Sequence, residues 1–241
     1  MTLFGHAPAS GELRPAPPDE GREIPITREE LVVHRDPHSQ IAEQYRRLRN
    51  SLQALNPDGA ARSILLTSSL DGEGKTVSAL NLGLAIAELP QLRVLVVDAD
   101  LRRPAMEELL GLPRRLGLCE LLTGRLNLDQ AIRPTAVARF DVVGPGEVPG
   151  NIAEVLNLDR IRAVLNAMKR RYDYVLIDSP PVLTMNHPSV LGSLADGVLL
   201  VVRLGKTPKP LVEEAFRMLE NLGGNVLGTC VTGSSETDLA G

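Results

Sequence analysis

The segment from Ser68 to Thr76, S-S-L-D-G-E-G-K-T, constrains this chain more than any other. It follows an apolar run at residues 64–67 that predicts a buried strand, and it precedes a segment of helical periodicity at residues 77–89. A glycine-rich loop between a strand and a helix can direct its N–H groups and the helix N-terminus at one anion. The sequence therefore predicts a phosphate-binding loop.

The pattern in this loop is G-x-x-x-x-G-K-[ST], with Ser69 at the first glycine position. In such a loop Lys75 reaches the β- and γ-phosphates of a nucleotide, and the Thr76 hydroxyl lies on Mg²⁺. The dinucleotide pattern G-x-G-x-x-G fails, because Val77 occupies its third glycine position. We expect ATP phosphates to lie against Asp71, Gly72, Glu73, Gly74, Lys75, Thr76 and Val77.

Three acids follow two further apolar runs. Asp98 and Asp100 come at the end of residues 93–97, and Asp178 ends residues 172–177. Ligands of open parallel sheets bind outside the carboxyl ends of the strands, so these carboxylates are expected beside the phosphates. A solvated Asp-Arg turn at a strand end would also explain Asp98 and Asp100. A pair of acids is costly to crowd together unless a cation or a proton lies between them.

Strand and helix patterns alternate along the chain, which predicts an α/β fold with one doubly wound, mostly parallel sheet and helices on both faces. Besides the segments above, strands are expected near residues 140–143, 197–203 and 226–231, and helices near 106–110, 118–122, 128–132, 159–169 and 211–222. Residues 1–35 contain many prolines and are expected to be flexible, and residues 36–241 are expected to form a single domain.

A helix is also expected over about residues 39–55, with an apolar stripe formed by Ile41, Tyr45, Leu48 and Leu52. Glu43, Arg46 and Arg49 lie three residues apart on its polar flank. Ion pairing on a solvated helix would explain this spacing, and from the residues alone that interpretation is slightly favoured.

Composition excludes several classes of function. A net charge of −4, with three Phe, three Tyr and no Trp, gives no basis for nucleic-acid binding. No apolar run approaches the ~20 residues that a membrane span needs, and no signal peptide is evident. Cys119 and Cys230 are far apart and fit small buried residues in a reducing cytosol.

Together these motifs make the chain resemble the bacterial tyrosine kinases (BY-kinases), the cytoplasmic kinases of capsule and exopolysaccharide production. The resemblance covers about residues 36–232. Residues 68–76 look like the family's Walker A motif, V-V-D-A-D-L-R-R-P from Val96 looks like Walker A′, and V-L-I-D-S-P-P from Val175 looks like Walker B. Residues 43–49 resemble the family's E-x-x-R-x-x-R subunit-contact motif.

The resemblance implies a role for each matching residue. Lys75 would bind and polarise the phosphates, Thr76, Asp98 and Asp178 would hold Mg²⁺, and Asp100 would lie near the metal or take the proton of an incoming tyrosine hydroxyl. Glu43, Arg46 and Arg49 would contact a neighbouring copy, in a homo-oligomer that can close as a ring. The implied partner is a membrane-bound polysaccharide co-polymerase, or chain-length regulator, which would place the protein in the cytoplasm at the inner face of the membrane.

Two alternatives to an active kinase stay open. One is an ATP-controlled binding module of the same system, and the other is a positioning ATPase of the MinD/ParA type. The latter class usually has a lysine five residues before the Walker lysine, where this chain has Leu70. The family's C-terminal tyrosine cluster is absent from residues 233–241, so little autophosphorylation is expected.

Overall fold

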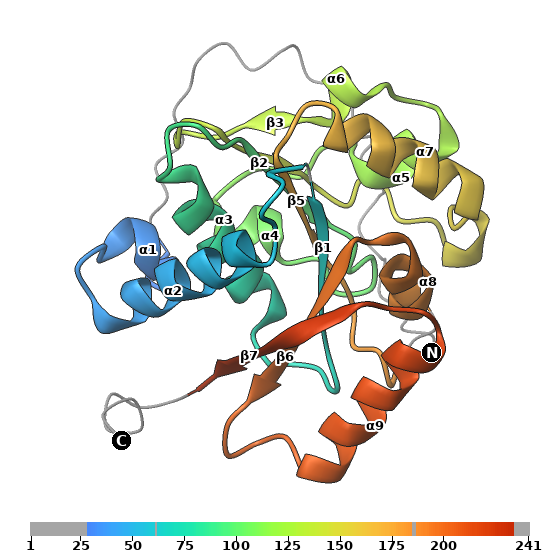
Figure 1. Ribbon diagram of the computed structural model, residues 1–241. Coiled ribbons are helices and arrows are strands. Elements are labelled where there is room, and N and C mark those ends of the chain that lie inside the picture. The colour runs from blue at the N-terminus through green and yellow to red at the C-terminus, as the bar shows by residue number, and fades with distance from the viewer. Residues whose placement is uncertain (1–27, 61, 185–186, 234–241) are drawn as a thin grey trace, which may run out of the picture.

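The computed structural model describes residues 28–60, 62–184 and 187–233. Within them, seven strands form one sheet in the order β3-β4-β2-β5-β1-β6-β7 (Figure 1). Every pair of neighbouring strands is parallel except β3 and β4, which are antiparallel. The predicted doubly wound, mostly parallel sheet is therefore confirmed. The strands are β1 (Arg62–Ser68), β2 (Val94–Asp98), β3 (Arg133–Pro134), β4 (Phe140–Val143), β5 (Tyr174–Asp178), β6 (Gly197–Arg203) and β7 (Val226–Thr232).

Helices cover both faces of this sheet. On one side lie α1 (Val32–Arg35), α2 (Gln40–Ala54), α3 (Lys75–Ala87) and α4 (Met106–Leu109). On the other lie α5 (Leu118–Thr123), α6 (Leu128–Ala131), α7 (Leu158–Lys169), α8 (His187–Leu194) and α9 (Lys209–Asn221), together with the 3₁₀ turn η1 (Ile152–Glu154).

The core has two halves, one on each face, because side chains alternate along a strand. Along β1, Ile64 and Leu66 pack with α3, whereas Leu65 packs in the opposite cluster with α7 to α9. The central strands are buried on both faces, as expected for a parallel sheet between helices. This arrangement brings the carboxyl ends of β1, β2 and β5 together at one edge.

The helix predicted near residues 39–55 is α2, which begins after Ser39. The Ser39 hydroxyl accepts a hydrogen bond from the Ala42 N–H at 3.1 Å and so caps the helix. The predicted apolar stripe is only partly buried: Leu52 is covered, but Ile41 is 43% exposed. The buried line of α2 instead includes Ala42 and Arg49.

The predicted flexible segment, residues 1–35, ends too late in the sequence. Its first 27 residues lie outside the described residues, but Leu31 and Val33 are buried and residues 32–35 form α1. The Asn81 side chain of α3 fixes this segment, since its Oδ1 accepts from the Val33 N–H and its Nδ2 donates to the Glu30 carbonyl. Apolar side chains just after the proline-rich region explain the difference.

Four short elements were not predicted: α1, β3, η1 and α8. Each has few residues or a mixed composition, so periodicity gives little signal. Among the described residues, no helix is both long and apolar enough to cross a membrane.

Candidate functional site

The phosphate-loop sequence lies between the end of β1 at Ser68 and the start of α3 at Lys75, as predicted. Two glycines give the loop its shape, because Gly72 has a φ of +74° and Gly74 a φ of +90°. Residues other than glycine rarely adopt these backbone angles. The loop therefore leads directly into the N-terminus of a 13-residue helix, whose dipole favours an anion there.

Lys75 is buried, although glycine-rich loops usually lie at the surface. It is the first residue of α3 and is only 6% exposed. Its ammonium lies close enough to Asp178 to lower the pKa of that carboxyl in part. A lysine at a helix N-terminus opposes the helix dipole, so the nearby carboxylate contributes to holding it there.

Asp98 and Asp178 are brought together by the register of the sheet. Each is the last residue of its strand, and they are direct neighbours across the β2–β5 pair. Both are fully buried. Asp98 Oδ2 accepts from the Met106 N–H at 3.2 Å, and its Oδ1 accepts from the Asp100 N–H at 3.2 Å.

The Asp178 carboxylate accepts no comparable hydrogen bond, although the Thr76 hydroxyl and the Lys75 ammonium lie near it. Neither of its carboxylate oxygens has a hydrogen-bond partner, and both are buried. Burial raises the pKa of Asp178, and burial together with the charge of Asp178 raises the pKa of Asp98. A buried carboxylate that accepts no hydrogen bond and lies next to a second carboxylate is unfavourable, and a cation would relieve the repulsion between them.

Asp100 completes the acidic cluster. It is 6% exposed, and its charge raises the pKa of both Asp98 and Asp178. Its Oδ1 accepts from the Arg103 N–H at 3.1 Å, which fixes the turn after β2. The three acids therefore lie near one another, and their place beside the phosphates stays a prediction. The solvated-turn interpretation of Asp98 and Asp100 is wrong, because both are buried.

The donor set fits a divalent cation that is only partly enclosed by protein. In the described residues, no group of three or more His, Cys, Asp or Glu could hold a metal alone. Two carboxylates and a threonine hydroxyl, completed by phosphate and water oxygens, are the usual surroundings of Mg²⁺ at a nucleotide. The unsatisfied oxygens of Asp178 supply the observation that favours such an ion.

The remaining predicted loop residues differ in what their side chains do. Asp71 is exposed and forms an ion pair with Arg103 at 3.3 Å, which links the phosphate loop to the turn after β2. The Glu73 side chain is buried and bonded within the protein, so only its backbone is available to a phosphate. Val77 lies in the first turn of α3.

Four supporting contacts were missed by sequence reasoning. Met106, whose N–H holds Asp98, begins α4, and the buried pair of Glu107 Oε1 and Arg133 Nη1 at 2.9 Å fixes that helix. Residues at the ends of β6 and β7 also reach the phosphate loop. These partners are distant in sequence, so no local pattern could indicate them.

The predicted subunit-contact residues are engaged within the chain. Arg46 forms two-pronged hydrogen bonds to Glu88 after the end of α3, and Arg49 donates to Glu88 and to the Ala85 carbonyl at 2.8 Å. Arg49 is 9% exposed, whereas Glu43 is exposed and lies 3.6 Å from Arg46. A contact with a neighbouring copy stays a prediction for all three residues.

Comparison with known proteins places this site in a family. The AAA domain family AAA_31 matches residues 61–214. The tyrosine-protein kinase YwqD of Bacillus subtilis is 32% identical over 203 residues, which cover 84% of this chain and 85% of that protein. The tyrosine-protein kinase Etk of Escherichia coli is 33% identical over 198 residues, and the matched region covers 82% of this chain but only 27% of Etk.

Solved structures agree with these sequence relatives. The kinase domain of Escherichia coli ETK superimposes with a TM-score of 0.80 at 30% identity, covering 90% of this chain and 84% of that one. The septum site-determining protein MinD from Pyrococcus horikoshii, solved with Mg-ADP, has a TM-score of 0.62 at 26% identity, covering 74% of this chain and 73% of that one. The fold is thus that of P-loop nucleotide-binding proteins, and this chain belongs to the bacterial tyrosine kinase family.

Proposed function

We propose that this chain is an ATP- and Mg²⁺-dependent protein-tyrosine kinase of the bacterial type. The observation that carries the proposal is the buried Asp98–Asp178 pair, which lies across neighbouring strands beside a phosphate loop with Lys75 at its end. By itself such a pair contributes little to the stability of the fold, because burial and mutual repulsion disfavour both charges. A cation bound between these acids and a triphosphate, at the carboxyl ends of the strands, would offset both charges.

The loop and the N-terminus of α3 would hold the phosphates, with residues 71–77 supplying backbone N–H groups. Lys75 would neutralise charge on the β- and γ-phosphates. Thr76, Asp98 and Asp178 would hold Mg²⁺, which would neutralise phosphate charge as the bond to the leaving oxygen breaks. Positioning and charge neutralisation are the main contributions of protein to this reaction.

Asp100 is the group we assign to the acceptor hydroxyl. In the transfer, the tyrosine oxygen forms a bond to the γ-phosphorus, the bond from that phosphorus to the β–γ bridging oxygen breaks, and ADP leaves. The hydroxyl proton goes to a carboxylate, and Asp100 lies at the end of the cluster nearest Arg103 and the exposed turn. Its slight exposure distinguishes it from the fully buried Asp98 and Asp178.

The substrate tyrosine is proposed to belong to another protein. The chain has three tyrosines: Tyr172 and Tyr174 are buried, at 4% and 3% exposed, and Tyr45 is partly buried and packs against the core. Burial raises the pKa of Tyr45 to about 12, and the Tyr172 hydroxyl donates to Asp141 at 2.7 Å. A hydroxyl must come within ~3.5 Å of the γ-phosphate for transfer, and burial makes these three hydroxyls poor acceptors.

We further infer a homo-oligomer, in which the flank of α2 with Glu43, Arg46 and Arg49 meets a neighbouring copy, and a membrane-bound polysaccharide chain-length regulator as partner. The family of the sequence relatives supports this inference. The partner would bring the protein from the cytoplasm to the inner face of the membrane.

Nucleotide binding by Lys75→Met tests the assignment. Wild-type protein should bind MgATP in calorimetry, and the variant should bind it at least ~100-fold more weakly, since a charge-assisted phosphate contact is lost in a buried site. Circular dichroism must show that the variant is folded, because Lys75 is itself buried. Equal affinity of the two proteins would contradict the assignment, and binding without any phosphotransfer would favour the ATP-controlled binding module.

A further inference from the structure

The side chain of Glu73, a residue of the phosphate loop, holds that loop in place. Glu73 lies between the two glycines of positive φ and is 1% exposed. One carboxylate oxygen, Oε2, accepts from the Leu70 N–H at 3.0 Å, and the other, Oε1, accepts from the Thr207 hydroxyl. The side chain therefore closes the loop on itself and joins it to the residue two positions before α9.

The direction of the Thr207 hydrogen bond is fixed. Its hydroxyl oxygen accepts from the Arg203 N–H at 3.3 Å, so the hydroxyl hydrogen is left for Glu73. A serine could make both contacts, but a valine of nearly the same shape could make neither. Thr207 thus offers a substitution that removes hydrogen bonds while keeping side-chain volume.

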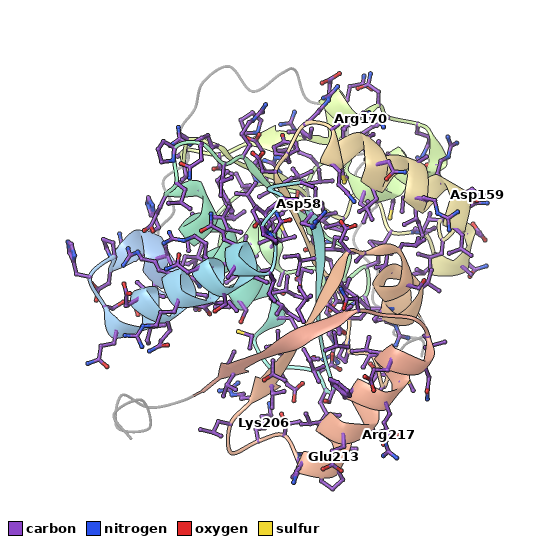
Figure 2. The ribbon with its side chains drawn as sticks, viewed as in Figure 1. Asp58, Asp159, Arg170, Lys206, Glu213 and Arg217 are labelled. Carbon is purple, nitrogen blue, oxygen red and sulfur yellow. The ribbon has the colours of Figure 1, made fainter. Side chains whose placement is uncertain are left out.

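Two further contacts reach the backbone of the same loop. Arg203, the last residue of β6, donates from Nη1 to the Gly72 carbonyl at 3.0 Å. Thr232, the last residue of β7, donates from its hydroxyl to the Glu73 carbonyl at 2.7 Å. The loop, the β6–α9 connection and the end of β7 gather at the lower end of the molecule, where Figure 2 labels Lys206 on that connection.

These contacts restrain a glycine-rich segment. Gly72 and Gly74 have no Cβ to restrict them, and a loop that must direct several N–H groups at one anion has to hold a single conformation. Without outside contacts, ordering it on binding would cost conformational entropy. The contacts from the end of β6, the β6–α9 connection and the end of β7 order it beforehand, and they engage the Gly72 and Glu73 carbonyls and the Glu73 carboxylate.

We propose that Glu73, Thr207 and Thr232 are positioning residues that preorganise the phosphate loop and couple it to the β6–α9 connection. The proposal rests on the nucleotide site proposed above. The Glu73 side chain does not take part in metal or phosphate binding, since both its oxygens are used within the protein. A displacement at the start of α9 or the end of β7 is transmitted to the loop and changes nucleotide affinity.

Thr207→Val and Thr207→Ser test this proposal as a pair. We expect Thr207→Val to weaken MgADP binding about tenfold, because a buried carboxylate oxygen loses its partner, whereas Thr207→Ser binds within about twofold of wild type. In transfer assays the KM for ATP should rise with kcat nearly unchanged, since the reacting groups are untouched. Amide hydrogen exchange across residues 70–75 should quicken in the valine variant alone.

Thr232→Val provides a second test if Thr207→Val does not fold, with Thr229→Val as its matched control. Thr229 is an exposed threonine on the same strand. Thr232→Val should weaken MgADP binding and Thr229→Val should not. Wild-type affinity and exchange in a folded Thr207→Val or Thr232→Val protein would overturn the inference, whereas no MgADP binding by wild type would overturn the proposed function instead.

Discussion

Replacing Glu88 with glutamine breaks the link between α2 and α3 without altering the predicted subunit-contact residues. Glu88 follows the last residue of α3, and it receives hydrogen bonds from Arg46 Nη2 at 2.7 Å, Arg46 Nε at 2.9 Å and Arg49 Nη1 at 3.2 Å. Its side chain is 33% exposed, so these bonds are partly screened by solvent. A carboxylate at a helix C-terminus is also opposed by the helix dipole, which makes its stability depend on the two arginines.

The size of the effect follows from this partial exposure. Fully buried charge-assisted hydrogen bonds contribute ~1.5–3 kcal/mol, whereas exposed ion pairs contribute ~0.2–1 kcal/mol. Glu88→Gln keeps one acceptor oxygen and the side-chain volume, so we expect the free energy of unfolding at pH 7 to fall by about 1–2 kcal/mol. Hydrogen bonds from Arg46 lower the pKa of Glu88 below its ordinary value of 4.5. The stabilisation is therefore present above pH 4.5 and is lost as the pH falls below it, where wild type and variant should converge.

Urea denaturation measures the loss of stability at pH 7 and the convergence of wild type and variant at pH 4. Exposed Glu214→Gln on α9 is the matched control. Light scattering of the same samples separates the contact of the arginines with Glu88 from their predicted contact with a neighbouring copy. If Arg46 and Arg49 also contact a neighbour, Glu88→Gln leaves them available and the oligomer persists, whereas Arg46→Ala weakens it. Equal unfolding free energies for wild type and Glu88→Gln at pH 7 would refute this reasoning.

Three further outcomes are expected. Asp178→Asn should raise the free energy of unfolding of the nucleotide-free protein by ~1 kcal/mol in urea denaturation, because burial and the charge of Asp100 disfavour the carboxylate more than Thr76 and Lys75 favour it. It should also abolish Mg²⁺-dependent turnover, and a less stable variant would contradict this account of the carboxylate. The isolated chain incubated with MgATP should carry almost no phosphotyrosine in mass spectrometry, since two of its tyrosines are buried and Tyr45 is partly buried. Stoichiometric modification would show that they are accessible. Asp196→Asn should lower the free energy of unfolding by ~2 kcal/mol. The reason is that Asp196 Oδ2 accepts hydrogen bonds from Lys169 Nζ and from the Ser63 N–H, each at 2.7 Å. An unchanged urea midpoint would refute this.

Much of the fold could be predicted from the sequence because its determinants are local. The strands at residues 94–98, 140–143 and 197–203 are short apolar runs bounded by polar or glycine residues, and they are found where expected. The phosphate loop and the acids at the ends of β2 and β5 follow from the same pattern, since parallel strands place their carboxyl ends at one edge.

What could not be predicted depends on contacts between distant segments. Lys75 is buried because Asp178, about a hundred residues later in the chain, lies beside it, and nothing in the loop sequence indicates this. Arg49 is engaged by the end of α3, so a polar residue of α2 is covered while the apolar Ile41 is exposed. The partners of Glu73 come from the last third of the chain, where Thr207 and Thr232 have no local signature.

The most direct test of the kinase assignment is phosphate transfer to an external tyrosine. Purified chain is incubated with MgATP labelled at the γ-phosphate and a tyrosine-containing polypeptide, beside Lys75→Met and Asp98→Asn and a reaction with EDTA. We predict that label enters tyrosine in the wild-type reaction alone and that loss of Mg²⁺ or of either side chain reduces the rate at least ~100-fold. Transfer that continues at the wild-type rate in Lys75→Met or Asp98→Asn would contradict the assigned site, and no transfer by a wild-type protein that binds MgATP would contradict the assigned activity.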